Sequence, residues 1–454
     1  MYKKNLKIHF VGIGGIGMSG IAELLINLGY QISGSDIRRS PTTDRLKKLG
    51  TKIFLKHRAE NVEGSDLVVI SSAIKENNPE LIAAKEKKIT VLKRAEMLAE
   101  LMRMKYSIAV SGSHGKTTTT SLIAAVLEKG GKDPTAIIGG KLLSTGKNAE
   151  LGQGEFIVAE TDESDGTFLR VNPSIAVVTN IDKEHLDFYG SEENLKESFT
   201  QFINKVPFYG AAVVCIDDEN IQEIIPSIEK RMITYGFNSQ ADYSAEIKEV
   251  NNFSTYFELF EKGDKKAKLK INLSGKHNVL DALAAIAVGR ELDIPLKRIV
   301  EALEGFEGIE RRFQKKGEKR KIIVVDDYGH HPNEIKATLS AARKMWKGKI
   351  GVLFQPHRYS RTSLLLEDFY KAFYDCDILV VTDIYPAGES PIEGISAEKI
   401  AEGIKSHGHK NVAYIKDKKE IISFFSKALS EGDMFITLGA GNVYEVGEEF
   451  LKGK

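Results

Sequence analysis

Short apolar runs alternate with amphipathic segments along most of the chain. Many runs consist almost wholly of Val, Ile, Leu and Ala, which is typical of strands buried on both faces. Segments with apolar residues at helical spacing follow most of them. Strands that alternate with helices predict an α/β protein built of parallel sheets. The expected strands are Lys7–Val11, Gln31–Ser35, Val68–Ser72, Ile108–Val110, Phe156–Ala159, Ile175–Val178, Ala212–Ile216, Ile322–Val325, Ile350–Phe354, Ile378–Val381 and Met434–Leu438.

Two stretches depart from this pattern. Residues 242–273 alternate polar and apolar positions, which predicts antiparallel strands added at the edge of the middle sheet. The charged stretch Gln314–Lys321 separates two series of strands and is expected to lie at a domain boundary. A chain of 454 residues is long enough for about three domains. We expect them at residues 1–105, 106–312 and 313–454.

A shortened phosphate loop follows the strand at Ile108–Val110. Its residues are Gly112-Ser113-His114-Gly115-Lys116-Thr117, and a helical pattern begins directly after them. Loop N–H groups and the positive end of a helix bind anions, a lysine reaches the outer phosphates, and a threonine hydroxyl ligates Mg²⁺. Val110 stands where the full motif has its first glycine. The alternative is an ordinary turn between a strand and a helix.

A second glycine motif, Gly12-Ile13-Gly14-Gly15-Ile16-Gly17, lies between the first expected strand and helix, and Asp36 ends the next strand. This arrangement holds a nucleotide diphosphate at a helix N-terminus. NAD is the usual ligand, but the unit is short and a second phosphate loop follows by Gly112. A glycine turn without a ligand stays open. Asp36 is alternatively a solvated residue or a helix cap, and Ser71 and Ser72 are alternatively plain loop residues.

Polar residues follow the middle strands where these end. Glu160 ends one apolar strand, and His185 comes shortly after the next. Because ligands bind at the carboxyl ends of parallel strands, we expect both residues near Lys116 and Thr117. A threonine, a carboxylate and an imidazole can surround Mg²⁺ on a triphosphate. No guanine-reading [NT]-K-x-D motif is evident, so ATP is preferred to GTP. Taken alone, His185 is equally well a surface residue.

The last third repeats this arrangement of polar clusters after strands. Arg358 and Arg361 can clamp a carboxylate, or can be solvated loop residues. The adjacent His330 and His331 lack a cysteine or an acid at ligand spacing, so zinc is not expected. The other open residues each have two interpretations: His277 and Asn278 cap a helix or contact a base, while Arg311 and Arg312 are solvated or reach a γ-phosphate. The clusters are Asp326–Pro332, Gln355–Arg361, Asp383–Glu389 and Gly439–Asn442.

The composition limits the kinds of partner that the protein can be expected to bind. Lys and Arg number 64 against 63 Asp and Glu, so the charge gives no case for nucleic acid or an anionic membrane as partner. Cys215 and Cys376 both lie in apolar, strand-like runs and are expected to be buried free thiols. No apolar stretch approaches the ~18 residues of a membrane span, and no signal-peptide pattern opens the chain. We expect a cytoplasmic protein.

Taken in order, the motifs resemble those of the Mur ligase family over nearly the whole chain. Any single motif is moderate evidence, but the ordered set is specific. The set is Gly12–Met18, Gly112–Thr117, Glu160–Asp165, Thr179–Asp182 with His185, Gly275–Asn278, Arg311–Phe313, Asp326–Pro332, Gln355–Arg361 and Tyr385–Glu389.

The resemblance implies a Rossmann-like N-terminal domain, a central P-loop-type ATPase domain with a parallel sheet, and a Rossmann-like C-terminal domain. It implies an ATP-dependent ligase that joins L-alanine to UDP-N-acetylmuramate with Mg²⁺ or Mn²⁺, as a monomer or homodimer. The first glycine motif would then hold a UDP diphosphate and not NAD. Implied UDP-sugar residues are Gly12, Gly14, Gly15, Gly17, Asp36, Ser71 and Ser72.

The resemblance also assigns the remaining roles. Implied ATP residues are Gly112, Ser113, His114, Gly115, Lys116, Thr117, Thr118, His277, Asn278, Arg312 and Asp327. Implied metal ligands are Thr117, Glu160 and His185, and the implied amino-acid site is Tyr328, His330, Arg358 and Arg361. The residues expected to act in catalysis are Lys116, Glu160, His185, Arg312 and His330.

Three positions depart from the family pattern. Ser113 replaces a threonine, and Asp281 replaces an asparagine expected near the adenine. Phe199 occupies the position of a carbamylated lysine found in sister ligases, so another group must support a second metal. Rival functions are a ligase that recycles murein peptides, a folylpolyglutamate synthetase-like ligase, an NAD-linked dehydrogenase and a non-catalytic nucleotide-binding module.

Overall fold

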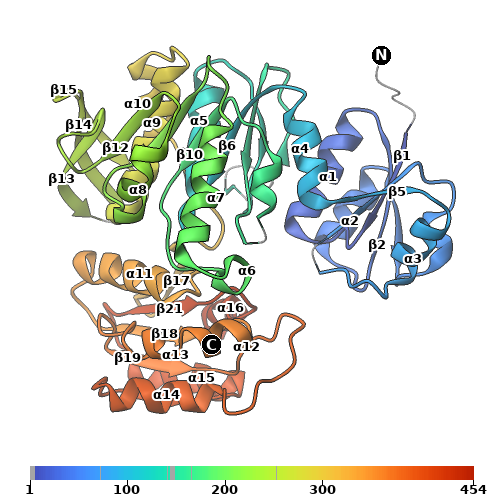
Figure 1. Cartoon of the computed structure of the whole chain (residues 1–454). Coiled ribbons are helices and arrows are strands. Elements are labelled where there is room, and N and C mark those ends of the chain that lie inside the picture. Colours follow the sequence, from blue (N-terminus) through green and yellow to red (C-terminus); the bar gives the residue numbers. More distant parts are fainter. Residues whose placement is uncertain are drawn as a thin grey trace. The chain divides into compact units, whose positions relative to one another are not determined.

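The computed structural model describes residues 6–71, 73–140, 142–143, 149–164, 166–251 and 253–453. These residues form three sheets flanked by helices (Figure 1). Their internal contacts define two compact units. The first comprises Met1–Glu246, Glu258–Leu269 and Leu280–Phe306; the second comprises Ile247–Phe257, Lys270–Val279 and Glu307–Lys454.

The first sheet has the strand order β3-β2-β1-β4-β5, and all its pairs are parallel. The chain reverses its direction of winding between β1 and β4, which places a ligand crevice at the carboxyl ends of these strands. The expected strand at 68–72 ends at Ile70, so Ser71 lies in the following loop, while Ser72 lies outside the described residues. The elements are β1 (Lys7–Val11), α1 (Ile16–Asn27), β2 (Gln31–Asp36), α2 (Pro41–Lys48), β3 (Lys52–Leu55), η1 (Ala59–Val62), β4 (Leu67–Ile70), α3 (Pro79–Glu86), β5 (Thr90–Lys93) and α4 (Arg94–Met102).

The second sheet has ten strands in the order β15-β14-β13-β12-β11-β10-β6-β9-β7-β8. Strands from β12 to β7 run parallel, as the apolar runs predict. The strands are β6 (Tyr106–Ser111), β7 (Thr135–Ile137), β8 (Ala149–Glu150), β9 (Phe156–Glu160), β10 (Ile175–Val178), β11 (Ala211–Cys215), β12 (Met232–Gly236), β13 (Tyr243–Asn251), β14 (Ser254–Glu261) and β15 (Asp264–Ile271). The helices are α5 (Lys116–Lys129), η2 (Thr167–Arg170), α6 (Leu186–Tyr189), α7 (Glu192–Asn204), α8 (Glu219–Ile224), η3 (Ile225–Ser227), α9 (Lys276–Glu291) and α10 (Leu296–Glu304).

The edge addition expected at 242–273 is confirmed as β13, β14 and β15. Consecutive strands are neighbours in the sheet and are joined by only two residues, as in hairpins. Lys262 and Gly263 connect β14 to β15 with φ angles of 51° and 84°. Two successive positive φ angles are the geometry that a two-residue hairpin turn requires.

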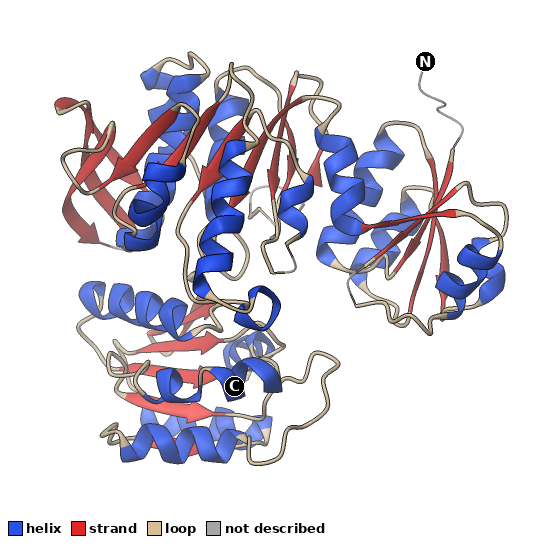
Figure 2. Ribbon diagram, viewed as in Figure 1, coloured by secondary structure: helices blue, strands red, loops and turns tan. Residues whose placement is uncertain are grey.

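The third sheet has the order β16-β17-β21-β18-β19-β20 and is parallel except for β16. Helices cover both of its faces (Figure 2). Alternate residues of each strand enter two different cores: Val352 and Phe354 pack with α11, α13 and α14, while Leu353 packs with α15 and α16. The elements are β16 (Gln314–Lys319), β17 (Ile322–Asp327), α11 (Pro332–Met345), β18 (Ile350–Phe354), α12 (Tyr359–Leu364), α13 (Leu366–Tyr370), β19 (Ile378–Val381), α14 (Ala397–Ser406), β20 (Val412–Tyr414), α15 (Lys418–Ala428), β21 (Met434–Leu438) and α16 (Tyr444–Lys452).

Two local expectations need correction. The charged stretch Gln314–Lys321 is not merely a connecting segment, because Gln314–Lys319 forms the antiparallel edge strand β16. An edge strand tolerates lysines because one of its sides is unpaired. Cys376 lies before β19 and not within a strand, although both cysteines are buried and free as expected. Within the described residues, no helix is long and apolar enough to cross a membrane.

A substitution of Phe199 on α7 tests how much the core beneath the second sheet contributes to stability. Its ring is fully buried and lies 5.1 Å from that of Phe168. Replacing Phe199 by alanine should cost about 3–5 kcal/mol of stability, because the cavity cannot fully collapse. Phe208 is 94% exposed and gives the matched control, with an expected change within about 0.5 kcal/mol. Urea unfolding followed by circular dichroism measures both; equal midpoints would contradict the described core.

Candidate active site

The phosphate loop runs from the end of β6 to the start of α5. Gly112 has φ 135°, and a Cβ at this position would lie 2.1 Å from Thr179 Oγ1. Gly115 immediately precedes α5 with φ 78°. Both positions therefore favour glycine, because of the positive φ and because a Cβ would lie too close to a neighbouring side chain.

Residues after β10 hold the loop in place. Asn180 Oδ1 accepts a hydrogen bond from the His114 N–H at 2.8 Å, and Asn180 Nδ2 donates to the His114 carbonyl at 3.0 Å. Thr179 Oγ1 donates to the same carbonyl, and the Asp182 N–H donates to Ser113 Oγ at 2.8 Å. The N–H groups of Lys116, Thr117 and Thr118 open α5, where a helix provides no acceptors for them. This end of the loop is therefore suited to an anion.

The Lys116 side chain folds back onto its own loop. Its Nζ donates to the carbonyls of Gly112 at 2.5 Å and Ser113 at 3.1 Å, and to Glu163 Oε1 at 2.9 Å. An ammonium group has three hydrogens, so these acceptors satisfy it. Burial acts to lower the pKa of Lys116, but the carboxylates of Glu163 and Glu160 outweigh it and hold this pKa above its usual value. Lys116 is therefore fully charged.

Glu163, three residues beyond the end of β9, is only 2% exposed. Burial raises the pKa of this carboxyl group to about 7, against the opposing influence of Lys116. Its Oε2 atom is buried and has no hydrogen-bond partner among the described residues. A buried carboxylate in this position depends on the cation beside it.

The predicted metal ligands do not all touch one another: Thr117 contacts Glu160, and His185 contacts other acids. Thr117 Oγ1 donates to Glu160 Oε2 at 2.8 Å, which is the hydroxyl–carboxylate pair expected around Mg²⁺. His185 Nε2 instead lies 3.7 Å from Glu184 Oε2 and 4.0 Å from Glu163 Oε1. His185 has φ 58°, a left-handed conformation that is uncommon for residues other than glycine and concentrates at functional sites.

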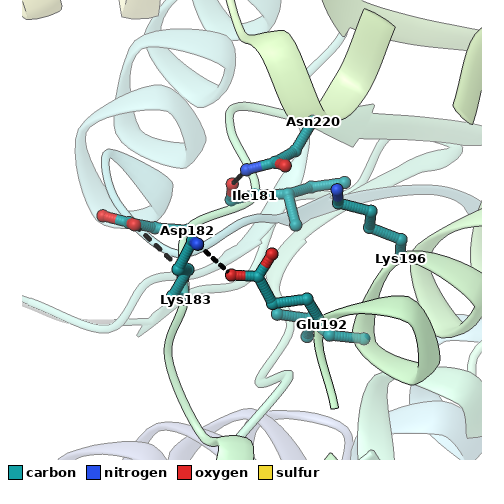
Figure 3. Close-up of a pocket in the computed structure, with 7 residues that line it drawn as sticks. Ile181, Asp182, Lys183, Glu192, Lys196 and Asn220 are labelled. Carbon is teal, nitrogen blue, oxygen red and sulfur yellow. Dashed lines mark hydrogen bonds and ion pairs between the residues drawn. The ribbon is translucent and has the colours of Figure 1, made fainter. Parts of the chain in front are cut away.

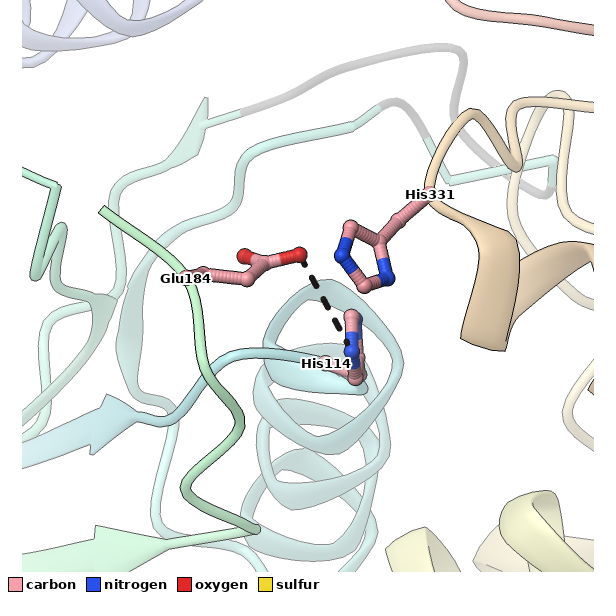
Figure 4. A group of neighbouring side chains, drawn as sticks. All are labelled: His114, Glu184 and His331. Carbon is pink, nitrogen blue, oxygen red and sulfur yellow. Dashed lines mark ion pairs between the residues drawn. The ribbon is translucent and has the colours of Figure 1, made fainter. Parts of the chain in front are cut away.

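His114 contributes a second imidazole on this side of the loop. Its Nε2 lies 3.1 Å from Asp182 Oδ2. It also lies 3.9 Å from Glu184 Oε1, as Figure 4 shows. The loop, Glu184 and the residues after β10 are thereby linked through side chains as well as through the backbone.

Asp281, the departure on α9, lies against the phosphate loop. It is 5% exposed, and its Oδ1 accepts a hydrogen bond from Thr119 Oγ1 at 2.9 Å. The same oxygen would lie 2.5 Å from a Cβ added to Gly115. The side chain thus braces the start of α5.

The first glycine motif forms a separate loop on the first sheet. The N–H groups of Gly12 and Ile13 both donate to the Ser35 carbonyl, at 2.9 and 3.0 Å. Asp36 Oδ2 accepts from the Gly14 N–H at 2.8 Å. Ser71 lies against Gly12, since a Cβ there would meet Ser71 Oγ at 3.0 Å. Of the other predicted residues, Gly15 precedes α1 and Gly17 lies in its first turn.

Arg311 and Arg312, both in the second unit, differ in their partners and in their exposure. Arg311 Nε pairs with the fully buried Asp326 at 2.9 Å, and its other nitrogens donate to the carbonyls of Gly439 and Gly441. Arg312 lies 5.5 Å from the centre of the Tyr328 ring and is more exposed. Arg311 therefore links β17 to the loop after β21, while Arg312 is the arginine with more access to a ligand.

The predicted amino-acid residues gather at the carboxyl ends of β17 and β18. The rings of His330 and His357 lie 5.7 Å apart, and His357 stacks on Tyr385 at 5.5 Å. Burial lowers the pKa of His330 to about 3 and that of His357 to about 4, so both imidazoles are neutral near pH 7. Arg361 Nη1 lies 3.4 Å from His357 Nδ1, and the Arg358 N–H donates to the Tyr385 carbonyl.

Three other predicted nucleotide residues also belong to the second unit. Both oxygens of the buried Asp327 accept backbone N–H groups, from Gly329 at 2.8 Å and Phe313 at 2.7 Å. At the start of α9, Asn278 Nδ2 donates to the Ser274 carbonyl at 2.7 Å and lies 3.1 Å from His277 Nε2. Each of these side chains has a structural role in its own element.

A small surface pocket lies beside α7 and contains none of the predicted site residues. An ion pair between Lys183 and Glu192 borders it (Figure 3), and Lys196 pairs with Glu223. Its lining residues are Ile181, Asp182, Lys183, Glu192, Leu195, Lys196 and Asn220. The pocket gives no reason to move the candidate site away from the phosphate loop.

Some residues at the site received no role from the sequence. Glu163 contacts Lys116, and Glu184 contacts His185. Asn180 orients the phosphate loop, and His357 and Tyr385 stack beside the predicted amino-acid residues. All of them follow strands of the parallel sheets, so their place after an apolar run was the available signal.

The fold and the site together define a nucleotide-binding enzyme. Helices flank three sheets, and the loop after β6 carries a lysine and a threonine that suit a phosphate group. Three family models match the chain in order: "Mur ligase family, catalytic domain" over residues 7–106, "Mur ligase middle domain" over 110–289 and "Mur ligase, glutamate ligase domain" over 311–441. The chain belongs to the Mur ligase family.

The similar proteins are more specific. A UDP-N-acetylmuramate--L-alanine ligase of Geotalea uraniireducens (strain Rf4) is 58% identical over the full length of both chains. The protein of the same name from Geobacter sulfurreducens is 56% identical, over 99% of this chain and 98% of the other. Among solved structures, a UDP-N-acetylmuramate-alanine ligase from Thermotoga maritima matches with TM-score 0.85 and 32% identity over 98% of each chain. A murein peptide ligase from Psychrobacter arcticus shares the fold, with TM-score 0.73 and 22% identity over 98% of each chain.

The neighbouring arginines allow a matched test. Arg311→Met should destabilise the protein by about 3–5 kcal/mol, because it leaves the Asp326 carboxylate buried without its cation. Arg312→Met should cost about 1 kcal/mol or less, since its pairing is looser and more exposed. Urea unfolding measures the difference. Equal destabilisation by the two changes would contradict the assigned environments.

Proposed function

We propose that this protein is an ATP-dependent ligase that joins L-alanine to the carboxylate of UDP-N-acetylmuramate in peptidoglycan precursor synthesis. The observation that carries the proposal is the conjunction of two facts. Relatives that are 55–58% identical over essentially the whole chain bear the name of this activity. The phosphate loop, with Lys116 and the Thr117–Glu160 pair, has the donor and acceptor groups that ATP and Mg²⁺ require.

The reaction must activate a carboxylate, which is a poor electrophile towards an amine. A carboxylate oxygen of UDP-N-acetylmuramate attacks the γ-phosphorus of ATP, and ADP leaves. The resulting acyl phosphate has a good leaving group. The amine of L-alanine then attacks the acyl carbon, the tetrahedral intermediate collapses, and inorganic phosphate leaves with the original carboxylate oxygen. One proton is lost from the amine.

We assign the first step to Lys116, Thr117, Glu160 and Arg312. Lys116 and Arg312 would neutralise the charge on the transferring phosphoryl group. A divalent cation, Mg²⁺ or Mn²⁺, supplies further charge stabilisation when bound, and Thr117 and Glu160 would hold it. Their hydroxyl and carboxylate oxygens are ligands that suit such an ion. We place the domain boundaries near residues 105 and 312.

The third domain would bind the amino acid. Arg358 and Arg361 can pair with the L-alanine carboxylate or the muramate carboxylate. Because the His330 pKa is depressed to about 3, its imidazole is neutral and cannot repel the amino group of the substrate. The first sheet would bind the UDP diphosphate at the Gly12–Gly17 loop, in which Asp36 already orders Gly14. Because ATP is its co-substrate, we place the enzyme in the cytoplasm.

The principal alternative within the family is a ligase that recycles murein peptides. Two solved ligases of this kind are 22% and 26% identical to the chain, the second over 67% of it, whereas a solved alanine-adding ligase is 32% identical over 98%. An NAD-linked dehydrogenase would use the first glycine loop but would leave Lys116 and Thr117 without a role.

The proposal predicts phosphate release from ATP only when UDP-N-acetylmuramate and L-alanine are both present. Lys116→Ala should lower this rate by at least about 10²-fold, because it removes a charge that stabilises the transition state. UDP-N-acetylmuramate binding, measured by calorimetry, should stay within about twofold, since Lys116 lies outside the first glycine loop. No release with L-alanine, glycine or L-serine in the wild type would refute the proposed activity. Loss of UDP-sugar binding in the variant would refute the assignment of the two loops.

A further inference from the structure

A buried carboxylate, that of Glu80, joins several elements of the first sheet. Glu80 lies in the first turn of α3 and is fully buried. Its Oε2 accepts a hydrogen bond from Ser35 Oγ at 2.6 Å and lies 2.8 Å from His57 Nδ1. Its Oε1 accepts a hydrogen bond from Asn61 Nδ2 and lies 3.5 Å from His9 Nε2. One side chain of α3 therefore connects β1, β2, η1 and the segment after β3.

The carboxyl group of Glu80 is ionised. Burial acts to raise its pKa, but hydrogen bonds from His9, Ser35 and Asn61 outweigh this influence and hold the pKa below its usual value. An ionised carboxylate can only accept hydrogen bonds. It therefore determines which atoms of its neighbours carry a proton.

The contacts of His57 determine the tautomer of its ring. Its Nδ1 lies 2.8 Å from Glu80 Oε2 and 2.9 Å from Ser35 Oγ. The Ser35 hydroxyl donates to Glu80, so both neighbours present lone pairs to Nδ1, and Nδ1 must carry a proton. In the neutral ring, Nε2 is then a hydrogen-bond acceptor. Nε2 makes no hydrogen bond among the described residues, and the side chain is 15% exposed.

His57 also lies beside the predicted nucleotide residues. The Lys56 N–H donates to the Asp36 carbonyl at 2.9 Å, which extends the pairing of β2 with β3 by one residue at its carboxyl end. His57 is the next residue along the chain. The first glycine loop follows β1, Asp36 ends β2 and His57 follows β3, and these three strands are neighbours in the order β1-β2-β3.

The parts of a uridine diphosphate have the same order as these strands. The proposed function places the diphosphate at the glycine loop, and an acid at the end of the second strand binds a ribose. The base then lies towards β3. Uracil presents a donor, its N3–H, which an acceptor at Nε2 matches. Cytosine presents a lone pair at N3, which the same acceptor would repel.

We propose that His57 selects uracil at the nucleotide site of the first sheet by accepting a hydrogen bond from the N3–H of the base at Nε2, and that Glu80 is the positioning residue that orients the ring. The inference rests on the proposed function, because it takes a uridine nucleotide as the ligand of this sheet. It adds a specificity-determining residue that no sequence motif indicated.

The test compares UDP with CDP as ligands of the full-length protein. Displacement of UDP-N-acetylmuramate in titration calorimetry gives both dissociation constants at this site alone. His57→Asn keeps an amide nitrogen near the position of Nδ1, where it can still contact Glu80, but has no atom at the position of Nε2. It should lower the preference for UDP over CDP by at least about fivefold, with a urea-unfolding midpoint close to that of the wild type.

His57→Gln gives the complementary result, because its amide group reaches the position of Nε2. It should keep the UDP affinity within about threefold of the wild type, since the amide oxygen can accept from uracil. It should nevertheless lose the preference for UDP, because the amide can rotate and donate to cytosine. An unchanged preference in His57→Asn would overturn the proposal, as would a wild type that binds UDP and CDP equally well.

Asn61→Ala is the matched control. Asn61 also donates to Glu80, but its Nδ2 contacts only Glu80 and the Lys56 carbonyl, so its role is structural. This change should lower the urea-unfolding midpoint and leave the preference for UDP over CDP unchanged. A preference that falls equally in Asn61→Ala and His57→Asn would show that His57 only braces the sheet, and would overturn the proposal.

The role of Glu80 is tested through His57. Glu80→Gln should lower the preference for UDP in the wild type but should lower it no further in the His57→Asn background, because Glu80 acts through the ring. An additional loss in that background would contradict the positioning role. The two His57 variants decide the question if Glu80→Gln does not fold. Absence of UDP-N-acetylmuramate binding by the wild type would refute the proposed function and this inference together, whereas binding with an unchanged preference in His57→Asn refutes the inference alone.

Discussion

The site depends on one constraint: the positive charge of Lys116 is enclosed by protein and must always have partners. Enclosing an ammonium group is unfavourable unless carbonyl oxygens and a carboxylate replace its hydration. Here Gly112, Ser113 and Glu163 supply them. The loop conformation that offers these carbonyls requires glycine at position 112 and is braced by the residues after β10.

The same constraint links binding to chemistry. To contact phosphate oxygens, Lys116 must give up at least one of its three acceptors, and the loss of its contact with Glu163 would favour the protonated form of that buried carboxyl group. On the third sheet, burial keeps His330 and His357 neutral, so the guanidinium of Arg361 is the charged group among them. Burial thus keeps the two histidines neutral, whereas neighbouring carboxylates keep Lys116 charged in spite of its burial.

Much of the fold was predictable because its strands are apolar on both faces. The continuous runs at β6, β10 and β18 were recognised, whereas β3, β16 and β20 were not. These three strands are only partly buried, and β16 consists almost entirely of polar residues, so no continuous apolar run marks them. Their stability comes from neighbouring strands that are distant in sequence.

Some residues of the site could likewise be recognised from the sequence, and others could not. Lys116 and Thr117 stand in a local motif whose chemistry can be recognised from adjacent residues. The positions of Glu163 and Glu184 depend on β6 lying between β9 and β10, and no local pattern encodes that order. Likewise, Arg311 and Arg312 are adjacent and chemically identical, yet only the packing of the third sheet shows that Arg311 is the less exposed one and pairs with a buried acid.

The central claim is that this chain activates a carboxylate with ATP and passes it to an amine. The most direct measurement is the fate of the carboxylate oxygens. UDP-N-acetylmuramate labelled with ¹⁸O in its carboxylate should give inorganic phosphate that carries one ¹⁸O atom per turnover with ATP and L-alanine, as read by mass spectrometry. Product formation with unlabelled phosphate would contradict the account, because no acyl phosphate would then have formed.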